Sequence, residues 1–221
     1  MTDIVDLEPP AATATWLGIF ARLYDPFLWL GEVSGMRRRR KTLLENARGR
    51  VLELGAGTGL NAALYPPDVT EVILTEPEPG MRRKLARRLA RQGTAARIVD
   101  APAERLPVED ASVDTVVSTL VLCTVPDPAA ALREVARVLR PDGELLFIEH
   151  VRADGASLAR WQDRLAEPWR RFAGGCMCNR DTVELMRTNG FTVAVDDAVW
   201  RGMPALVRPL AVGYAALTPV T

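Results

Sequence analysis

The feature that most constrains the fold of this 221-residue chain is a short apolar segment that runs into a glycine-rich loop. Residues 51–54 read Val-Leu-Glu-Leu, and residues 55–59 read Gly-Ala-Gly-Thr-Gly, with glycine at every second position. Because glycine has no Cβ, it allows a tight turn and lets a ligand lie against the main chain. The pattern predicts a buried strand, a turn that binds a ligand, and a helix that begins near Leu60.

Strand-like and helix-like segments alternate after this loop. Predicted strands cover residues 71–75, 96–99, 113–118 and 144–149, and predicted helices cover 81–92 and 128–139. Two later segments, 191–195 and 210–216, are expected to form strands that pair at one edge. Alternating strands and helices require crossover connections, which give a parallel sheet with helices on both faces. We predict an α/β fold with a single Rossmann-like, doubly wound sheet of seven strands, mostly parallel with an antiparallel edge strand.

The residues before Gly49 have a different character. Residues 1–14 are polar and without periodicity, so we expect a loose tail. Apolar residues recur at helical spacing over 16–30, with Pro26 as an interruption, and 34–47 form a second predicted helix. We interpret the arginine run at 37–40 as a solvated helix face. Residues 1–48 are thus expected to form a tail and lid helices, and residues 49–221 the main part of one structural domain.

Composition limits the partners and the compartment. Lys plus Arg and Asp plus Glu each total 28, whereas binding of nucleic acid calls for a concentrated positive field. The three cysteines form no CxxC pair, so we expect no metal. The acidic N-terminus is unlike a signal peptide, and no apolar run reaches the roughly 18 residues that span a bilayer. We expect a cytoplasmic protein without a transmembrane segment.

Two acidic residues accompany the glycine loop. Glu53 lies inside the first strand, and Glu76 follows the second strand, where a carboxylate can accept both hydroxyls of a ribose. Dinucleotide-binding loops carry G-x-G-x-x-G, but Leu60 stands where this chain would need the third glycine. These residues favour a nucleoside with a cationic tail over one with a pyrophosphate, and they argue against a nicotinamide oxidoreductase.

Five motifs occur in a characteristic order: 51–61 (VLELGAGTGLN), Glu76, 103–107 (AERLP), 116–127 (VVSTLVLCTVPD) and 134–143 (EVARVLRPDG). Together they resemble the class I methyltransferases that use S-adenosylmethionine, in the branch with the ubiquinone and menaquinone C-methyltransferases. Through residues 119–125, 147–150 and 167–180, the chain is most similar to animal methyltransferase-like proteins that act on alkyl thiols. The resemblance implies that residues 49–221 are the methyltransferase domain, with S-adenosylmethionine as cofactor and S-adenosylhomocysteine as product.

The resemblance also implies which residues bind the cofactor. The glycine loop would line it through backbone groups, Glu53 would neighbour the methionine amino group, and Glu76 would hold the ribose. Many relatives carry an aspartate where this chain has Pro102, so either Asp100 substitutes or backbone groups alone select the adenine. The complete implied set is Glu53, Gly55, Ala56, Gly57, Gly59, Asn61, Glu76, Pro77, Met81, Pro102, Ala103, Glu104, Thr119 and Leu120.

Methyl transfer is an in-line displacement, so the enzyme must align the reactants and exclude water. A general base is optional for a thiol but is needed for a hydroxyl or a carbon acid. His150, the only histidine, ends the fifth predicted strand at the edge where α/β sheets bind ligands. It is the candidate catalytic base, with a purely structural histidine as the alternative, and strand alternation turns Glu149 to the opposite face.

The cysteines and aromatic residues indicate the acceptor side. We interpret Cys123 as an inert buried residue, and Cys176 with Cys178 as part of a loop over the acceptor pocket. Trp161, Trp169 and Phe172, with the aromatic residues of 16–30, suggest an apolar lid.

The sequence therefore predicts a methyltransferase that acts on a small, apolar molecule, with a thiol as the favoured nucleophile. Two alternatives stay open: the acceptor is a phospholipid headgroup amine or a quinone-like ring, or the chain is a non-catalytic module that binds the cofactor. Peripheral membrane contact and the choice between monomer and homodimer are also left open.

Overall fold

The computed structural model describes residues 23–218, and its strands and helices alternate as predicted. The strands are β1 (Gly49–Leu54), β2 (Val69–Thr75), β3 (Arg97–Val99), β4 (Val113–Thr119), β5 (Leu139–His150), β6 (Phe191–Val199) and β7 (Pro209–Leu217). They form one sheet in the order β3-β2-β1-β4-β5-β7-β6. Strands β1 to β5 run parallel, and β7 pairs antiparallel with both β5 and β6. The predicted fold class is confirmed.

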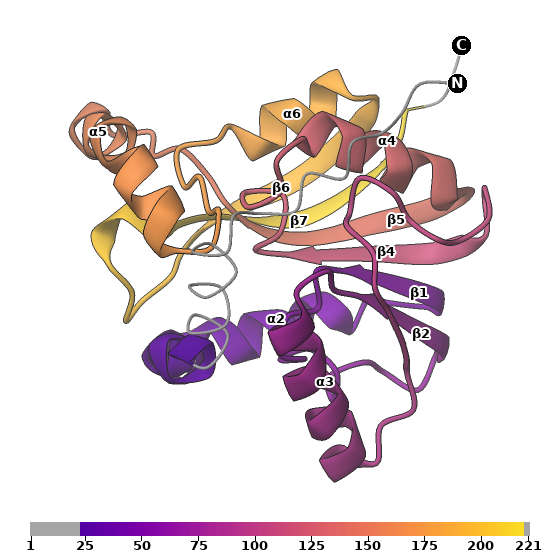
Figure 1. Cartoon of the computed structure of the whole chain (residues 1–221). Helices are drawn as coiled ribbons and strands as arrows, with labels where there is room; N and C mark the ends of the chain where they lie inside the picture. The colour runs from indigo at the N-terminus through magenta and orange to yellow at the C-terminus, as the bar shows by residue number, and fades with distance from the viewer. Residues whose placement is uncertain (1–22, 219–221) are drawn as a thin grey trace, which may run out of the picture.

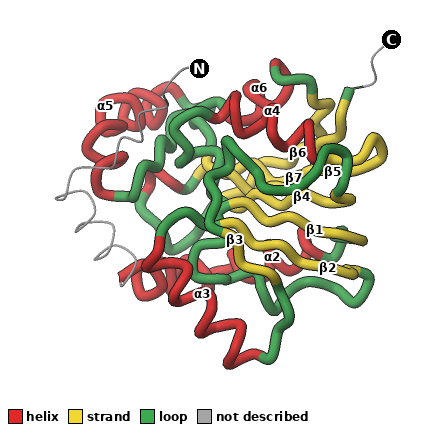
Figure 2. Tube along the Cα trace, turned by 45° about the vertical axis from the view of Figure 1, so that its right-hand side comes forward, coloured by secondary structure: helices red, strands yellow, loops and turns green. Residues whose placement is uncertain are grey.

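Helices cover both faces of this sheet (Figures 1 and 2). They are a helix over residues 23–31, a π-helical segment η1 (Glu32–Met36), α2 (Arg37–Leu44), α3 (Pro79–Gln92), α4 (Pro128–Val138), α5 (Ala156–Phe172), α6 (Thr182–Thr188) and a 3-10 turn η2 (Ala205–Val207). Alternate strand residues separate the two faces. Leu52 belongs to the core cluster under α4 and α6, whereas Val51 belongs to the cluster under α2.

Helices α3 and α4 begin in the same way. An acidic side chain precedes each helix and accepts a hydrogen bond from a backbone N–H of the first turn: Glu78 from Met81 at 2.6 Å, and Asp127 from Ala130 at 2.9 Å. A proline follows the acid in both helices, where its missing N–H costs nothing. These caps fix the two helix starts close to the edge at which β2 and β4 end.

The structure differs from the sequence prediction in four places. No helix begins near Leu60, where one was predicted, and residues 55–68 instead form turns and bends between β1 and β2. The helix over 23–31 runs through Pro26, where an interruption was predicted, while the predicted tail and residues 16–22 lie outside the described part. Strand β5 begins at Leu139 rather than at Glu144, because Leu139 pairs with Val113. The helices α5 and α6 were not predicted as elements. Within residues 23–218, no helix is both long and apolar enough to cross a membrane.

Candidate functional site

A cavity of about 1170 Å³ lies where the parallel strands end. Ten of the residues singled out from the sequence line it: Gly55, Gly57, Glu76, Pro77, Met81, Pro102, Ala103, Glu104, Leu120 and His150. Five others do not line it: Glu53, Ala56, Gly59, Asn61 and Thr119. The helix over 23–31 and the end of α5 close the cavity from the other side, and both lie at the left end of the sheet in Figure 1.

Gly55, Gly57 and Gly59 have positive φ angles of 48°, 57° and 82°, which residues other than glycine rarely adopt. Their surroundings differ. A Cβ on Gly59 would lie 2.6 Å from Leu85 Cδ1, so this glycine is required for packing against α3. A Cβ on Gly57 would meet no atom closer than 3.9 Å, because this position opens onto the cavity. Gly57 therefore forms a cradle in which a ligand can touch the main chain.

Glu76 is nearly buried beside this cradle. Its carboxylate accepts hydrogen bonds from the backbone N–H groups of Gly57 and Glu78, each at 2.8 Å. Burial raises the pKa of Glu76, although these two hydrogen bonds act in the opposite direction. The contacts orient the carboxylate at the cavity wall, where its free lone pairs suit the two hydroxyls of a ribose.

A buried polar network lies beneath the loop. Glu53 accepts hydrogen bonds from Asn61 Nδ2 at 2.9 Å and from the Tyr65 hydroxyl at 2.5 Å. Burial raises the pKa of Glu53 to about 7. Arg40 donates to Asn61 Oδ1 at 3.1 Å and to Thr119 Oγ1 at 3.0 Å. Three residues predicted to bind the cofactor thus support the cavity floor from below.

The interpretation of the arginine run is wrong for Arg40, whose side chain is only 3% exposed and also pairs with Glu32 at 3.1 Å. Residues 37 and 38 are exposed, as expected. A signal was present in the sequence, because Arg40 shares a helix face with Met36 and Leu44, both fully buried.

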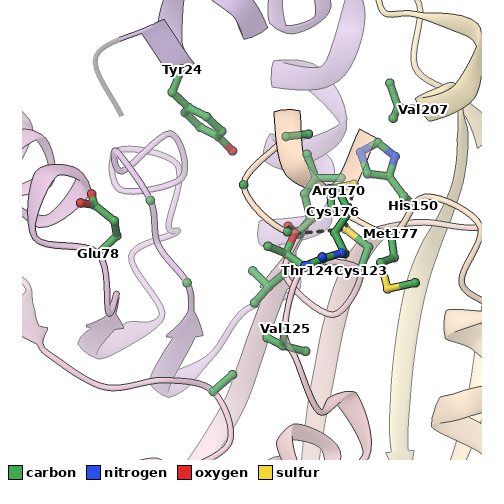
Figure 3. A pocket seen from close by; sticks show the side chains of 18 of the residues that line it. Tyr24, Glu78, Cys123, Thr124, Val125, His150, Arg170, Cys176, Met177 and Val207 are labelled. Carbon is green, nitrogen blue, oxygen red and sulfur yellow. Dashed lines mark hydrogen bonds between the residues drawn. The ribbon is translucent and has the colours of Figure 1, made fainter. Parts of the chain in front are cut away.

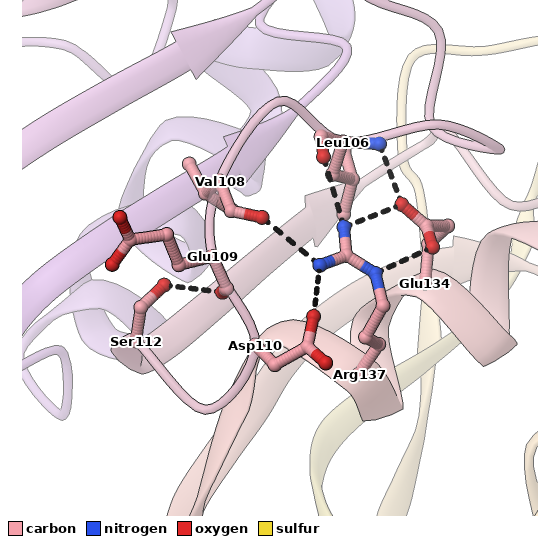
Figure 4. Close-up of polar contacts among 7 residues, drawn as sticks. All are labelled: Leu106, Val108, Glu109, Asp110, Ser112, Glu134 and Arg137. Carbon is pink, nitrogen blue, oxygen red and sulfur yellow. Dashed lines mark hydrogen bonds and ion pairs between the residues drawn. The ribbon is translucent and has the colours of Figure 1, made fainter.

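The loop that carries Pro102, Ala103 and Glu104 is held by α4. Figure 4 shows the Arg137 guanidinium donating to the carbonyls of Leu106 and Val108 at 2.9 and 3.0 Å, and to the Asp110 carboxylate at 2.6 Å. Glu134 accepts from the Leu106 N–H at 2.7 Å. These contacts link two of the five motifs, 103–107 and 134–143, since the second fixes the loop formed by the first.

Glu149 fixes the turn after β4. It accepts hydrogen bonds from the Ser118 hydroxyl and from the backbone N–H groups of residues 121–123. The expectation that it points away from His150 is confirmed. Leu120, at the start of this turn, has a φ angle of 64°, which is strained for a residue other than glycine. The turn holds Leu120 against the cavity.

His150 lies on the wall opposite the glycine loop. Its ring stacks on Trp200, with centroids 5.5 Å apart and an interplanar angle of 26°. Burial lowers the pKa of His150 to about 4, so the imidazole is neutral near pH 7. Among the described residues, its Nδ1 has no hydrogen-bond partner.

Figure 3 shows Cys123, Cys176 and His150 on one side of the cavity, with Tyr24 and Glu78 on the other. Trp169 lines the cavity, and Phe172 packs edge-on against Phe27 of the first helix. Trp161 is 52% exposed and does not line the cavity, so the predicted aromatic wall is only partly formed. The sequence analysis also missed Trp200, Met203 and Val207, because the 200–208 loop has no periodic pattern.

The comparisons with known proteins agree with this geometry. The family model described as Methyltransferase domain matches residues 52–147. The chain is 37% identical over 170 residues to human thiol S-methyltransferase TMT1A, covering 75% of this chain and 69% of that protein. It is 42% identical over 145 residues to human thiol S-methyltransferase TMT1B, covering 63% of this chain. In that case the chain spans 59% of the length of the relative.

Among solved structures, a SAM-dependent methyltransferase from Thermotoga maritima superposes with a TM-score of 0.68 at 21% identity, covering 94% of this chain and 100% of that chain. This likeness shows the shared fold. The cradle at Gly57 and the oriented carboxylate of Glu76 fit a nucleoside, and the cofactor of the family is S-adenosylmethionine, which leaves as S-adenosylhomocysteine. The chain belongs to the class I S-adenosylmethionine-dependent methyltransferases.

Proposed function

We propose that this enzyme methylates a small, apolar thiol. The observation that carries the proposal is the character of the wall opposite the glycine loop, where Trp169, Trp200, Met203 and Val207 surround a histidine with a pKa of about 4. Such a histidine is a weak general base, which disfavours an acceptor that must lose a tightly held proton. A thiol with an ordinary pKa of about 8.5 supplies its own thiolate near neutral pH. The names of human TMT1A and TMT1B support the same acceptor.

The proposed cofactor site follows from the cavity floor. Backbone groups of residues 55–59 approach the methionine portion, Glu53 and Asn61 act on its amino end from beneath the loop, and Glu76 binds the ribose. Pro77, Met81 and residues 102–104 surround the adenine. Asp100 pairs with Arg82 at 2.6 Å and does not line the cavity, which supports selection of the adenine by backbone groups.

The remaining residues exclude water and align the acceptor. Tyr24, Phe27 and Leu28 of the first helix line the cavity beside Trp169, so the described part of the N-terminal segment, residues 23–48, acts as a lid on the catalytic domain that begins at residue 49. When bound, the cofactor supplies a methyl group activated by a positively charged sulfur. The strained Leu120, with Thr119 beneath it, sets the floor at which the acceptor sulfur must approach that methyl group in line.

A panel of acceptors tests the proposal. Radiolabelled S-adenosylmethionine is incubated with the full chain and with matched small thiols, phenols, amines, quinols and phospholipid vesicles. We expect labelled thioether from the thiols, with a rate that rises with pH in step with the thiolate fraction.

Two outcomes contradict the proposal. Transfer only to phospholipid amines or quinols moves the chain to the alternative acceptor class. Tight binding of S-adenosylhomocysteine, measured by calorimetry, with no product from any acceptor indicates a non-catalytic module.

A further inference from the structure

Three side chains with metal-binding atoms meet in the acceptor wall. Cys123 lies in the turn after β4, His150 ends β5, and Cys176 lies in the loop after α5. The ligand atoms of all three lie within 4.8 Å of one another, and the two sulfur atoms are 4.0 Å apart. All three residues are buried, and all three line the cavity. Figure 3 shows the three side chains grouped around one point.

A second, independent observation is the unpartnered nitrogen of His150. The side chain is 95% buried, since only 5% of it is exposed, yet Nδ1 has no hydrogen-bond partner among the described residues. Buried polar atoms of this kind are rare and call for an explanation, such as an ion that the protein binds. The ring itself is held in place, because it stacks on Trp200. A fixed imidazole with one free nitrogen is the usual state of a histidine ligand.

The distances suit zinc. Zinc binds cysteine sulfur at about 2.3 Å in tetrahedral geometry, which places two such sulfurs about 3.8 Å apart. The observed 4.0 Å needs little adjustment. Two thiolates also cancel the charge of the ion, so the complete site is neutral, as its burial requires. Two sulfurs and one imidazole are a donor set that zinc accepts, and a site with three protein ligands leaves one position open.

We propose that Cys123 Sγ, His150 Nδ1 and Cys176 Sγ bind a zinc ion whose fourth coordination position faces the cavity. The role of that position rests on the proposed function: it takes the sulfur of the acceptor. The acceptor thiol releases its proton to water as it binds. A lone pair of its sulfur then forms the new carbon–sulfur bond, while the bond between the methyl group and the cofactor sulfur breaks and leaves its electrons on that sulfur.

The sequence analysis expected no metal because the three cysteines form no CxxC pair, and it placed Cys176 and Cys178 together in one loop. The structure separates these two residues. Cys178 is fully buried but does not line the cavity and is not part of the cluster. It therefore provides a matched control: the same residue type, in the same loop, with the same burial.

Metal binding tests the site without any acceptor. Bound metal is removed from the full chain with a chelator under reducing conditions. The chain is then titrated with Zn²⁺, and the bound zinc is quantified by elemental mass spectrometry. Co²⁺ is the second probe, because thiolate ligands give it an intense charge-transfer absorption. We expect one ion per chain in the wild type and in Cys178→Ala. Cys123→Ala and Cys176→Ala lose more than about 100-fold in affinity, beyond the roughly 10–100-fold caused by losing a residue that only orients a ligand.

Binding of S-adenosylhomocysteine confirms that each variant is folded, because the cluster lies outside the cofactor half. The proposal is overturned if the stripped wild type binds neither Zn²⁺ nor Co²⁺ when it is titrated. It is equally overturned if Cys178→Ala loses the ion while Cys176→Ala keeps it. Thiol methylation at an unchanged rate in zinc-free enzyme removes the proposed role of the ion but leaves the proposed function intact. Zinc binding without methylation of any thiol supports the metal site but contradicts the proposed function.

Discussion

The two halves of the cavity are built in different ways. The cofactor half comes from three short continuous segments at the strand ends: residues 51–61, residues 76–81 with the Glu76 carboxylate, and residues 102–104. The acceptor half is assembled from side chains that lie far apart in the chain, including Cys123, His150, Cys176 and Trp200. Only the folded sheet brings these residues to one wall.

Because of this difference, the residues of the cofactor half are constrained in type, whereas those of the acceptor half are free to vary. The cofactor half acts through backbone groups, so it demands glycine and an acid at fixed spacing, and few other residues can replace them. The acceptor half acts through the shape and chemistry of side chains, which can change without disturbing the sheet. A family built in this way keeps one cofactor and varies its acceptors.

The largest effect is expected at Arg40, which lies outside the motif 51–61 but supports it from below through Asn61. Replacing Arg40 with methionine leaves the Glu32 carboxylate and Asn61 Oδ1 without this donor and removes one of the two hydrogen bonds that Thr119 Oγ1 accepts. Loss of one partner from such a network costs about 3–5 kcal/mol. We expect chemical denaturation to show this loss in the free energy of unfolding of Arg40→Met. The exposed neighbour provides the control, since Arg38→Met should change stability by no more than about 0.5 kcal/mol; equal effects would place Arg40 in solvent.

The next largest effect is expected at Glu76. Glu76→Ala removes the proposed ribose contact and leaves the N–H groups of Gly57 and Glu78 without their acceptor. Hydrogen bonds to a charged group contribute about 1.5–3 kcal/mol each, so binding should weaken by about 3 kcal/mol, or about 100-fold. Calorimetry with S-adenosylhomocysteine measures this directly. Glu71→Ala, which is exposed on the strand β2 that precedes Glu76, should bind normally, and unchanged affinity in Glu76→Ala would refute the ribose assignment.

Glu53, in the cofactor half, should make the free energy of unfolding depend on pH. Its pKa is about 7 in the folded chain against 4.5 for an ordinary glutamate, so between these values the folded state holds a proton that the unfolded state has released. Its contribution to stability is therefore complete below pH 4.5 and is lost as the pH rises through 7, by about 1 kcal/mol per pH unit. We expect the difference in unfolding free energy between the wild type and Glu53→Gln to follow this slope. A flat difference from pH 5 to 8 would mean that the carboxylate is ionised throughout.

The same contrast explains how far the sequence could predict the molecule. The strand–helix alternation predicted the sheet, and glycine spacing with Glu76 predicted the loop and acid at the cavity edge, because these patterns are local. Arg40 was misread because a run of four arginines hides the one that shares a face with Met36. The Cys123–His150–Cys176 cluster could not be predicted, because its three members come together only through the order of β4 and β5 and the path of the chain after α5.

The smallest and most selective effect is expected within the loop itself. Gly57 and Gly59 both have left-handed φ angles, so alanine at either position costs about 1–2 kcal/mol of stability. At Gly59 the added Cβ also meets buried Leu85, which should increase the loss of stability but leave the affinity for S-adenosylhomocysteine intact. At Gly57 the added Cβ points into the open cradle, so Gly57→Ala should lose affinity instead. Thermal unfolding with and without S-adenosylhomocysteine separates the two. If both variants behaved alike, the loop would be a tight turn required only for packing, and backbone contact with the cofactor would no longer explain its glycines.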